Sequence, residues 1–258
     1  MPDDILLKAS EISRRFGGLV AVDRVSVTLT RGEVHSVIGT NGAGKSTLVN
    51  VLAGEIAASG GRVHLQDRDI TRWPQPKRAR AGVGRTYQRT TIFPRATVFE
   101  NCRLSAQAHH QHPFNWWHAA AGCAKSSALA HHAIEQAGLA GQAHRIAGTL
   151  SHGQKRQLEI AMCLSTTPQV LLLDEPLAGM GPEETERMLA LLATLKPGHG
   201  ILLIEHDMDA VFRIADRITV MVNGAVIATG TPDEIRNNPE VQIAYLGEIE
   251  RPAEAALT

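Results

Sequence analysis

The chain has 258 residues, with 26 Lys or Arg against 26 Asp or Glu, so its formal net charge is zero. This length suits one large α/β domain or two small ones. The balanced charge removes the electrostatic basis for a general nucleic-acid binder or a polybasic membrane anchor. A hydrophobic fraction of 43% excludes disordered, collagenous and coiled-coil classes. We expect a globular protein with a sizeable core and no nucleic-acid partner.

The cysteines and the N-terminal residues indicate the cellular compartment of the protein. Cys102, Cys123 and Cys163 are far apart and form no CxxC pair, which argues against a disulfide framework and a zinc ribbon. We expect three reduced, buried thiols. The first residues lack the basic and apolar regions of a signal peptide, and no apolar run approaches the ~18 residues of a membrane-spanning helix. These features predict a soluble, cytoplasmic chain.

The first third of the chain combines β-type runs with one glycine-rich segment. Strands are expected at Ile5–Leu7, Val25–Leu29, Val34–Ile38 and Arg62–Leu65. Residues 39–46 follow the third strand and open a helix over Ser46–Leu52. The pattern predicts a strand–loop–helix unit.

The middle of the chain changes character. Residues 97–148 are rich in Ala, His and Gln, and apolar residues fall on one helical face, namely Leu129, Ala133, Ile134 and Ala137. Beta-type runs then resume at Val170–Leu173, Ile201–Ile204 and Ile218–Val222, as in a parallel α/β sheet. A mostly helical insert therefore interrupts one sheet. A hairpin is expected at Asn223-Gly224, followed by a closing helix.

Residues 39–46, GTNGAGKS, fit the phosphate-loop pattern G-x-x-x-x-G-K-[ST] between a strand and a helix. Glycines let the backbone N–H groups curl around phosphate oxygens, and the positive end of the following helix faces them. Lys45 adds a charge for the β- and γ-phosphates, and Ser46 offers a hydroxyl to Mg²⁺. The alternative is a glycine-rich turn with an exposed lysine.

Two adjacent acids end the apolar run Val170–Leu173, at the edge where open α/β sheets bind ligands. We expect Asp174 to hold Mg²⁺, and Glu175 to orient or deprotonate the water that attacks the γ-phosphate. An acidic strand end alone is usually a solvated turn. The phosphate loop in the same chain favours the metal and water roles.

Residues 150–154, LSHGQ, lie at the expected start of another helix. Here the sequence resembles the ATP-binding cassette (ABC) family of transporter ATPases, whose signature is LSGGQ. Ser151 and Gly153 at a helix N-terminus would bind an anion. The alternative is a serine cap on an ordinary helix.

The resemblance assigns further residues. Gln88 is similar to the Q-loop glutamine, His206 to the H-loop histidine at the γ-phosphate, and Phe16 to the aromatic that stacks on adenine. For Phe16, a core residue is the alternative. The resemblance implies ATP and Mg²⁺ as cofactors, with Glu175, His206 and Gln88 as catalytic residues. The metal-binding residues that it implies are Ser46, Gln88 and Asp174. The nucleotide-binding residues that it implies are Phe16, Gly39, Asn41, Gly42, Ala43, Gly44, Lys45, Ser46, Thr47, Ser151, Gly153 and Gln154.

The fold implied is α/β, a P-loop NTPase (RecA-like) core with an N-terminal antiparallel β subdomain and an inserted helical subdomain. One ABC ATPase domain would span 1–247, with a catalytic core at 1–88 and 160–235, a helical subdomain at about 89–159 and a closing helix at 233–247. Residues 248–258 would be a tail.

Six segments are similar to bacterial ATPases that energise import of branched-chain or related hydrophobic amino acids, namely 14–22, 84–88, 97–101, 158–161, 205–208 and 244–248. This resemblance implies a homodimer or heterodimer with a second ABC ATPase subunit, integral-membrane permease subunits and, indirectly, a substrate-binding protein. The chain would sit peripherally at the inner face of the cell membrane. Alternatives are an exporter ATPase of the lipopolysaccharide type, a non-transport cassette protein, and a P-loop kinase or GTPase.

Three positions depart from the family pattern: Thr40 where Pro is usual, His152 in the signature, and Gly181 where the D-loop would carry Asn or Asp. After Gln88, Ile92 and Phe93 are expected on an exposed loop that receives a short helix of the permease. The alternative is that both fold back into the core.

Overall fold

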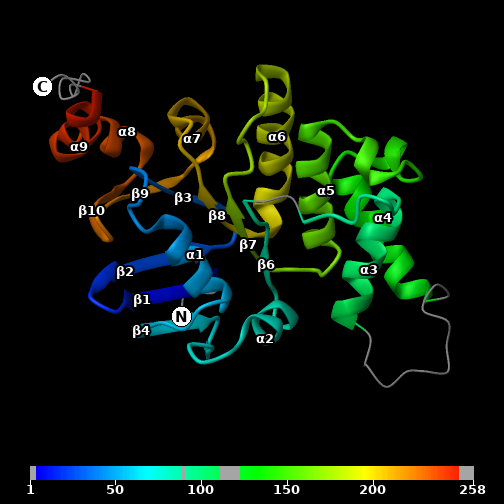
Figure 1. Ribbon diagram of the computed structural model, residues 1–258, viewed down its shortest axis with the longest axis horizontal. Helices are drawn as coiled ribbons and strands as arrows, with labels where there is room; N and C mark the ends of the chain where they lie inside the picture. The colour runs from blue at the N-terminus through cyan, green and yellow to red at the C-terminus, as the bar shows by residue number, and fades with distance from the viewer. Residues whose placement is uncertain (1–3, 89–90, 111–122, 250–258) are drawn as a thin grey trace, which may run out of the picture.

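The computed structural model describes residues 4–88, 91–110 and 123–249 (Figure 1). The strands are β1 Ile5–Phe16, β2 Leu19–Thr30, β3 Glu33–Gly39, β4 Gly60–Leu65, β5 Arg68–Asp69, β6 Val83–Arg85, β7 Val170–Asp174, β8 Gly200–Ile204, β9 Arg217–Val222 and β10 Ala225–Gly230. The α-helices are α1 Lys45–Ala53, α2 Gln75–Arg80, α3 Val98–His110, α4 Ala124–Gln136, α5 His152–Leu164, α6 Pro182–Leu195, α7 Met208–Ile214, α8 Pro232–Arg236 and α9 Pro239–Ile249. Among the described residues, no helix is both long and apolar enough to span a bilayer.

The strands form two sheets. The N-terminal sheet has the order β2-β1-β4-β5 and is antiparallel. The larger sheet has the order β10-β9-β3-β8-β7-β6, and every pairing in it is parallel except that of β10 with β9. The expected short runs are parts of longer strands: Ile5–Leu7 is the start of β1, and Val25–Leu29 lies in the second half of β2. The hairpin at Asn223-Gly224 is confirmed, and both residues adopt positive φ.

Helix α1 lies between the two sheets and holds them together (Figure 1). Every residue of β7 and of β8 is buried, because helices or the second sheet cover both faces of the larger sheet. Leu48, Val51 and Leu52 of α1 share one apolar cluster with residues of both sheets. Helices α6 and α7 pack on the opposite face. The predicted core with an N-terminal antiparallel sheet is therefore confirmed.

A buried arginine fixes the C-terminal end of α1. Arg78 is 2% exposed, and its Nη1 donates to Val51 O at 2.8 Å and to Leu52 O at 2.7 Å. These carbonyls belong to the last turn of α1, whose carbonyl groups lack the full set of helical donors, and Val51 O also accepts from Gly54 N at 3.1 Å. Burial lowers the pKa of Arg78 to about 10, so it stays charged at neutral pH. Arg78 therefore anchors the helix whose other end carries the phosphate loop.

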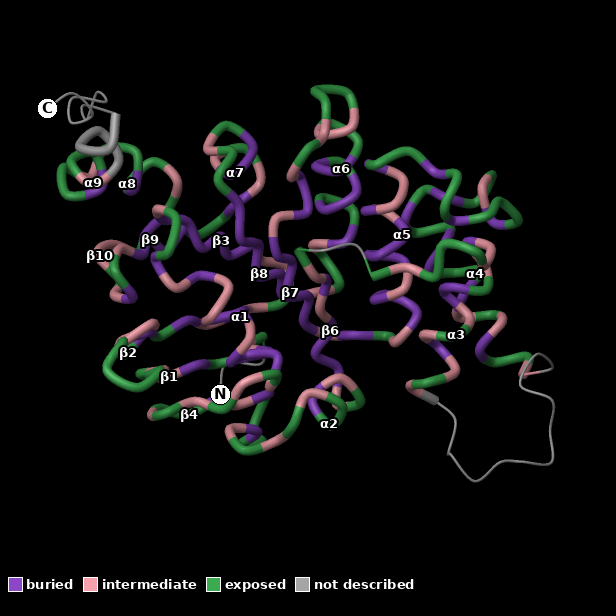
Figure 2. The backbone as a smooth tube through the Cα atoms, viewed as in Figure 1, coloured by how far each residue is buried: buried purple, intermediate pink, exposed green. Residues whose placement is uncertain are grey.

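Helices α3, α4 and α5 form a separate helical region with its own core around Val98, Ile134 and Leu158 (Figure 2). The boundary expected between residues 159 and 160 lies inside α5, which is continuous. One face of α5 packs in the helical core through Leu158, while Ile160 packs with the sheet and α6. A helix buried on two sides joins the regions, so the chain has no break there.

Two expectations are corrected. The closing helix expected at 233–247 is two helices, α8 and α9, because Pro239 has no N–H and starts a new helix. Asn238 Oδ1 accepts from the backbone of Glu240 at 2.9 Å and stabilises that start. Cys102 and Cys163 are buried as predicted, whereas Cys123 is only half-buried because it precedes α4 at the edge of the helical region.

Candidate active site

The phosphate loop connects β3 to α1 and is shaped by backbone contacts. Gly44 precedes α1 with φ 94°, and a Cβ at this position would lie 2.2 Å from Ala21 O. Only glycine fits that conformation and that space. None of the described side chains caps the N-terminus of α1. The first N–H groups of a helix lack partners within the helix, so this end suits phosphate oxygens.

Lys45 lies within the loop. Its side chain is 7% exposed, and Nζ donates to Gly39 O at 2.6 Å and to Thr40 O at 2.9 Å. These carbonyls hold the ammonium group at the loop that would receive the phosphates. Thr40, where the family usually has Pro, therefore contributes through its backbone carbonyl.

Asp174 ends β7 and faces the start of α1. It is 2% exposed, and Ser46 Oγ donates to its Oδ1 at 3.5 Å. Burial raises the pKa of Asp174, while Arg85, 4.0 Å from Oδ2, lowers it. A hydroxyl and a carboxylate are the hard oxygen donors that Mg²⁺ prefers. The residues present therefore fit the expected metal.

Glu175 follows β7 with φ 52°, which is unfavourable for a residue with a side chain. Its N–H donates to Ile204 O at 2.9 Å, which holds this backbone against β8. Gln88 Nε2 donates to Glu175 Oε2 at 3.0 Å, and His206 Nδ1 lies 3.4 Å from Oε1. The three predicted catalytic side chains are thus in contact.

One cavity of about 510 Å³ brings most of the predicted nucleotide-binding residues together. Gln88 and Glu175 line its catalytic end. Phe16 also lines it and is 45% exposed, with the Arg14 guanidinium 4.4 Å from the ring centroid. This exposure contradicts the core alternative for Phe16. Its stacking on adenine stays a prediction. The loop contributes Asn41, Gly42, Ala43, Gly44, Lys45, Ser46 and Thr47.

The signature residues line a different cavity, of about 430 Å³, which shares no lining residue with the first. Ser151 caps α5: its Oγ accepts from Gln154 N at 3.3 Å, and its N–H donates to Gln154 Oε1 at 3.1 Å. Glu184 of α6 also enters this cavity, where its Oε1 accepts from Ser151 Oγ at 3.0 Å and from Gly153 N at 3.3 Å. Sequence reasoning missed Glu184 because it lies 33 positions after Ser151.

The unusual signature histidine contacts the loop after Glu175. His152 Nε2 lies 2.9 Å from Ala178 O. Gly179 has φ 75°, and a Cβ there would lie 3.3 Å from the same Nε2. His152 and the glycine-containing D-loop, both departures from the family pattern, therefore pack against each other.

A second acid that sequence reasoning missed bonds to the backbone of the segment that follows Glu175. Glu205 is 1% exposed and accepts from Leu177 N at 2.7 Å and from His206 N at 3.3 Å. Burial raises its pKa to about 7. Glu205 thus joins the segments that carry Glu175 and His206. An acid directly after the apolar run Ile201–Ile204 was the available signal.

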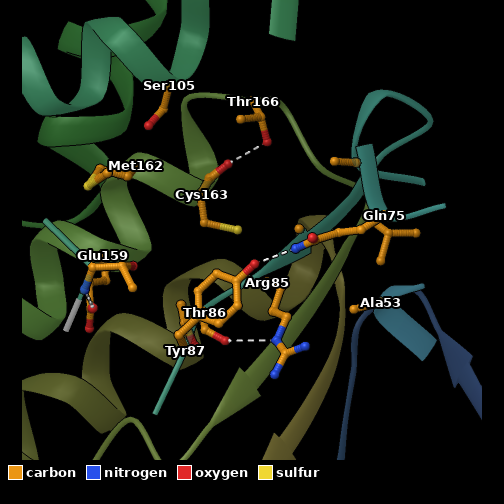
Figure 3. A pocket seen from close by; sticks show the side chains of 14 residues that line it. Ala53, Gln75, Arg85, Thr86, Tyr87, Ser105, Glu159, Met162, Cys163 and Thr166 are labelled. Carbon is orange, nitrogen blue, oxygen red and sulfur yellow. Dashed lines mark hydrogen bonds between the residues drawn. The ribbon is translucent and has the colours of Figure 1, made fainter. Parts of the chain in front are cut away.

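A third cavity, of about 210 Å³, lies between α2, β6 and α5 (Figure 3). Across it, Gln75 donates to the Tyr87 hydroxyl.

The loop residues Ile92 and Phe93, which follow Gln88 in the sequence, differ in burial. Ile92 packs against the helical core, so its expected exposure is wrong, whereas Phe93 is 54% exposed as predicted. Phe93 N donates to Asn101 Oδ1 at 2.7 Å, which fixes its backbone on α3.

A parallel sheet with a phosphate loop after one strand and an acid pair after another defines a P-loop NTPase with a RecA-like core. The sequence model of the family "ABC transporter" matches residues 22–178, and that of "Branched-chain amino acid ATP-binding cassette transporter" matches residues 225–250. The chain belongs to the ABC transporter family and is an ATPase of that family.

Curated relatives match along nearly the whole chain. The chain is 43% identical to the high-affinity branched-chain amino acid transport ATP-binding protein BraF of Pseudomonas aeruginosa, over 94% of this chain and 98% of BraF. It is 43% identical to LivG of Escherichia coli K12, a protein of the same description, with the same coverage. A solved ATP-binding cassette in its ADP conformation superposes with a TM-score of 0.85 at 32% identity, covering 94% of this chain and 99% of that one.

Proposed function

We propose that this protein is the ATP-hydrolysing subunit of a bacterial transporter that imports branched-chain or related hydrophobic amino acids. The support is the similarity to BraF and LivG along nearly the full length of all three chains. A strain without this chain is expected to lose uptake of radiolabelled leucine, isoleucine and valine. The wild-type chain restores uptake, and Glu175→Gln does not. Unchanged uptake of all three would contradict the proposed cargo and leave the ATPase assignment standing.

The proposed chemistry is attack of water on the γ-phosphate of ATP, which gives ADP and phosphate. Glu175 accepts the proton of the water, and Gln88 and His206 orient its carboxylate at 3.0 and 3.4 Å. Ser46, Gln88 and Asp174 would hold Mg²⁺, which neutralises charge on the phosphates when bound. Lys45 supplies a second positive charge at the loop.

Two subunits would pair head to tail, either as a homodimer or with a second ABC ATPase. The separation of the signature cavity from the phosphate-loop cavity supports this proposal, since the two cavities share no lining residue within one chain. Ser151 and Gly153 of one subunit would then face the ATP of the other.

Mixing variants tests the pairing. Ser151→Arg and Lys45→Ala proteins each lack both composite sites, while a mixed dimer keeps one intact site. We expect the mixture to recover part of the wild-type ATPase rate, and each variant alone to remain inactive. Two Ser151→Arg preparations mixed with each other serve as the control. Absence of recovery, with mixed dimers verified by a tag, would contradict the head-to-tail arrangement.

The membrane partner would be an integral-membrane permease, with a substrate-binding protein delivering the cargo to it. This arrangement places the chain peripherally at the inner face of the membrane. Exposed Phe93 and the cavity in Figure 3 support docking of a short permease helix here. Phe93→Ser is expected to keep the melting temperature and basal ATPase but to lose co-purification with the permease.

Ile243→Ser is the matched control for the docking test. Ile243 is 71% exposed on α9, at the other end of the molecule from the helical region (Figure 1). It is expected to co-purify normally. If Phe93→Ser also assembles and transports normally, docking at Phe93 is wrong.

A further inference from the structure

Two charged side chains of α5 are buried against the segment that follows β6. The side chains of Arg156 and Glu159 are 8% and 4% exposed, and Arg156 Nη1 donates to Glu159 Oε2 at 2.9 Å. A buried ion pair is weak evidence for stability, because desolvation opposes the attraction of the charges. The remaining contacts of the two side chains therefore indicate what the pair does.

These contacts are all with backbone groups of one short segment. Arg156 Nη1 donates to Tyr87 O at 2.9 Å, and Nη2 donates to Gln88 O at 2.6 Å. Glu159 Oε1 accepts from Thr91 N at 2.8 Å. The planar guanidinium fork reaches two successive carbonyls and the carboxylate at once. Figure 3 draws Glu159 with Thr86 and Tyr87 among the residues that line the third cavity.

The same face of α5 approaches β6 one turn further along. Cys163 follows Arg156 by seven residues and Glu159 by four, so the three side chains share a helix face. A Cβ added at Gly84 would lie 2.4 Å from Cys163 Sγ, so this approach requires glycine. Helix α5 is therefore in contact with β6 and with the segment after it.

Gln88 connects this contact to the active site. Its carbonyl is bound by Arg156, and its side chain donates to Glu175 Oε2 at 3.0 Å. Arg156 lies on α5, whose N-cap is Ser151. The Arg156 side chain thus joins Gln88, which contacts Glu175, to the helix that carries the signature motif.

We propose that Arg156 and Glu159 form a clamp that positions Gln88 for hydrolysis. Both are positioning residues, because they act through the backbone of Gln88 and Thr91. The proposal rests on the proposed role of Gln88.

Arg156→Lys tests the positioning. Lysine keeps the charge opposite Glu159 but cannot reach both carbonyls and the carboxylate. We expect kcat to fall about tenfold to a hundredfold, because small misplacements of catalytic groups have effects of this order. KM for ATP should stay within twofold, since the phosphate loop is untouched. Rates are measured well below each melting temperature and per ATP-binding molecule. Lys155→Met, the neighbouring basic residue on α5, is the control and should retain wild-type kcat. A wild-type kcat for Arg156→Lys would overturn the clamp.

A double-variant cycle shows whether Arg156 acts through Gln88. Arg156→Lys should lower kcat in the wild-type background and cause no further loss in Gln88→Ala. An equal loss in both backgrounds would overturn the proposal. If Gln88→Ala alone retained wild-type kcat, the role proposed for Gln88 would fail, and hydrogen exchange would decide on the clamp itself.

Hydrogen exchange measures the clamp without turnover. Glu159→Ala removes the acceptor of Thr91 N–H, so the peptide containing Gln88 and Thr91 should exchange at least about tenfold faster, with β7 and β8 unchanged. Glu159→Gln keeps an acceptor oxygen and should restore slow exchange, and it replaces the alanine variant if that one does not fold. A uniform increase across all peptides, or no change at Thr91, would show that the pair has only a structural role.

Discussion

Two helices of this chain begin at motifs suited to anions, and their first turns are built differently. Helix α1 follows Gly44, and none of the described side chains caps its N-terminus. Helix α5 is capped by Ser151 and Gln154, and Glu184 places a carboxylate oxygen 3.0 Å from Ser151 Oγ. The phosphate loop presents backbone donors to an incoming phosphate, whereas the signature motif already binds an anionic group of its own chain.

This difference has a physical consequence for ATP. A phosphate at α1 meets N–H groups and the Lys45 ammonium. A phosphate at α5 must displace the Glu184 carboxylate from Ser151 and Gly153 before it can bind the same donors. In the proposed head-to-tail dimer, the first motif would bind nucleotide already in a separate subunit, while the second would engage only when the partner's ATP displaces Glu184.

The largest expected effect on the ATPase rate is that of replacing Glu175, the acid that faces the phosphate loop. Glu175→Gln retains size and hydrogen bonding but cannot accept a proton, so kcat should fall by about 10²–10⁴ while ATP still binds. ATPase rates and binding of a fluorescent ATP analogue check this. Glu183→Gln is the control, because Glu183 is exposed in the first turn of α6. A wild-type rate for Glu175→Gln would contradict the role of the carboxylate.

Glu205 should make the free energy of unfolding depend on pH. Burial raises the pKa of Glu205 to about 7 from 4.5, so the folded protein holds a proton that the unfolded chain releases in that range. Its contribution is fully present below pH 4.5 and is lost as pH rises through 7. The loss is about 3 kcal/mol, at 1.36 kcal/mol for each unit of pKa shift.

Denaturant unfolding at pH 5 and pH 8 measures the Glu205 effect. The neighbouring charges that face this carboxyl are His206 and Glu175. Glu205→Gln, which does not titrate, should show a smaller difference in unfolding free energy between the two pH values than wild type. An equal difference in both proteins would assign the pH dependence to other groups.

Removal of the Lys45 ammonium group tests how the phosphate loop at the start of α1 binds ATP. Lys45→Ala deletes charge-assisted bonds to phosphate, each worth about 1.5–3 kcal/mol, so ATP affinity should fall by at least about tenfold. Equilibrium binding of a fluorescent ATP analogue measures it. Lys8→Ala, an exposed lysine of the N-terminal sheet, should bind normally. Unchanged affinity for Lys45→Ala would show that the loop binds phosphate through its backbone alone.

The smallest effect is expected at α5 and has the opposite sign. Glu184→Ala removes the competing carboxylate. Its effect is measured in the non-hydrolysing Glu175→Gln background, as the ATP concentration that gives half-maximal dimer formation. This concentration should fall by about two- to tenfold, which corresponds to the net free energy of one hydrogen bond. Size-exclusion chromatography with ATP measures this. Glu183→Ala removes the other acid of the same helical turn and should change little. A rise in that concentration for Glu184→Ala would mean that the carboxylate orders Ser151 and does not compete.

The sequence by itself determined the elements whose signals are local. Residues 39–46 form the phosphate loop because their glycines, lysine and serine are contiguous and stand between an apolar strand and a helix. Asp174 and Glu175 were predictable in the same way, since they directly follow a buried strand. The break at Pro239 was also readable, because proline starts helices and does not continue them.

Only the tertiary structure decided which distant residues meet. Glu184 bonds to Ser151 across 33 positions, and Arg156 to Tyr87 across 69. The sequence shows each as a charged residue of an amphipathic helix, and such residues are usually solvated. Ile92 is partly buried against the helical core while Phe93 is exposed, because the hydrogen bonds of the Phe93 backbone with Asn101 fix the turn of the chain. Contacts between helices packed on different cores depend on how those cores assemble, and no local pattern of residues encodes that assembly.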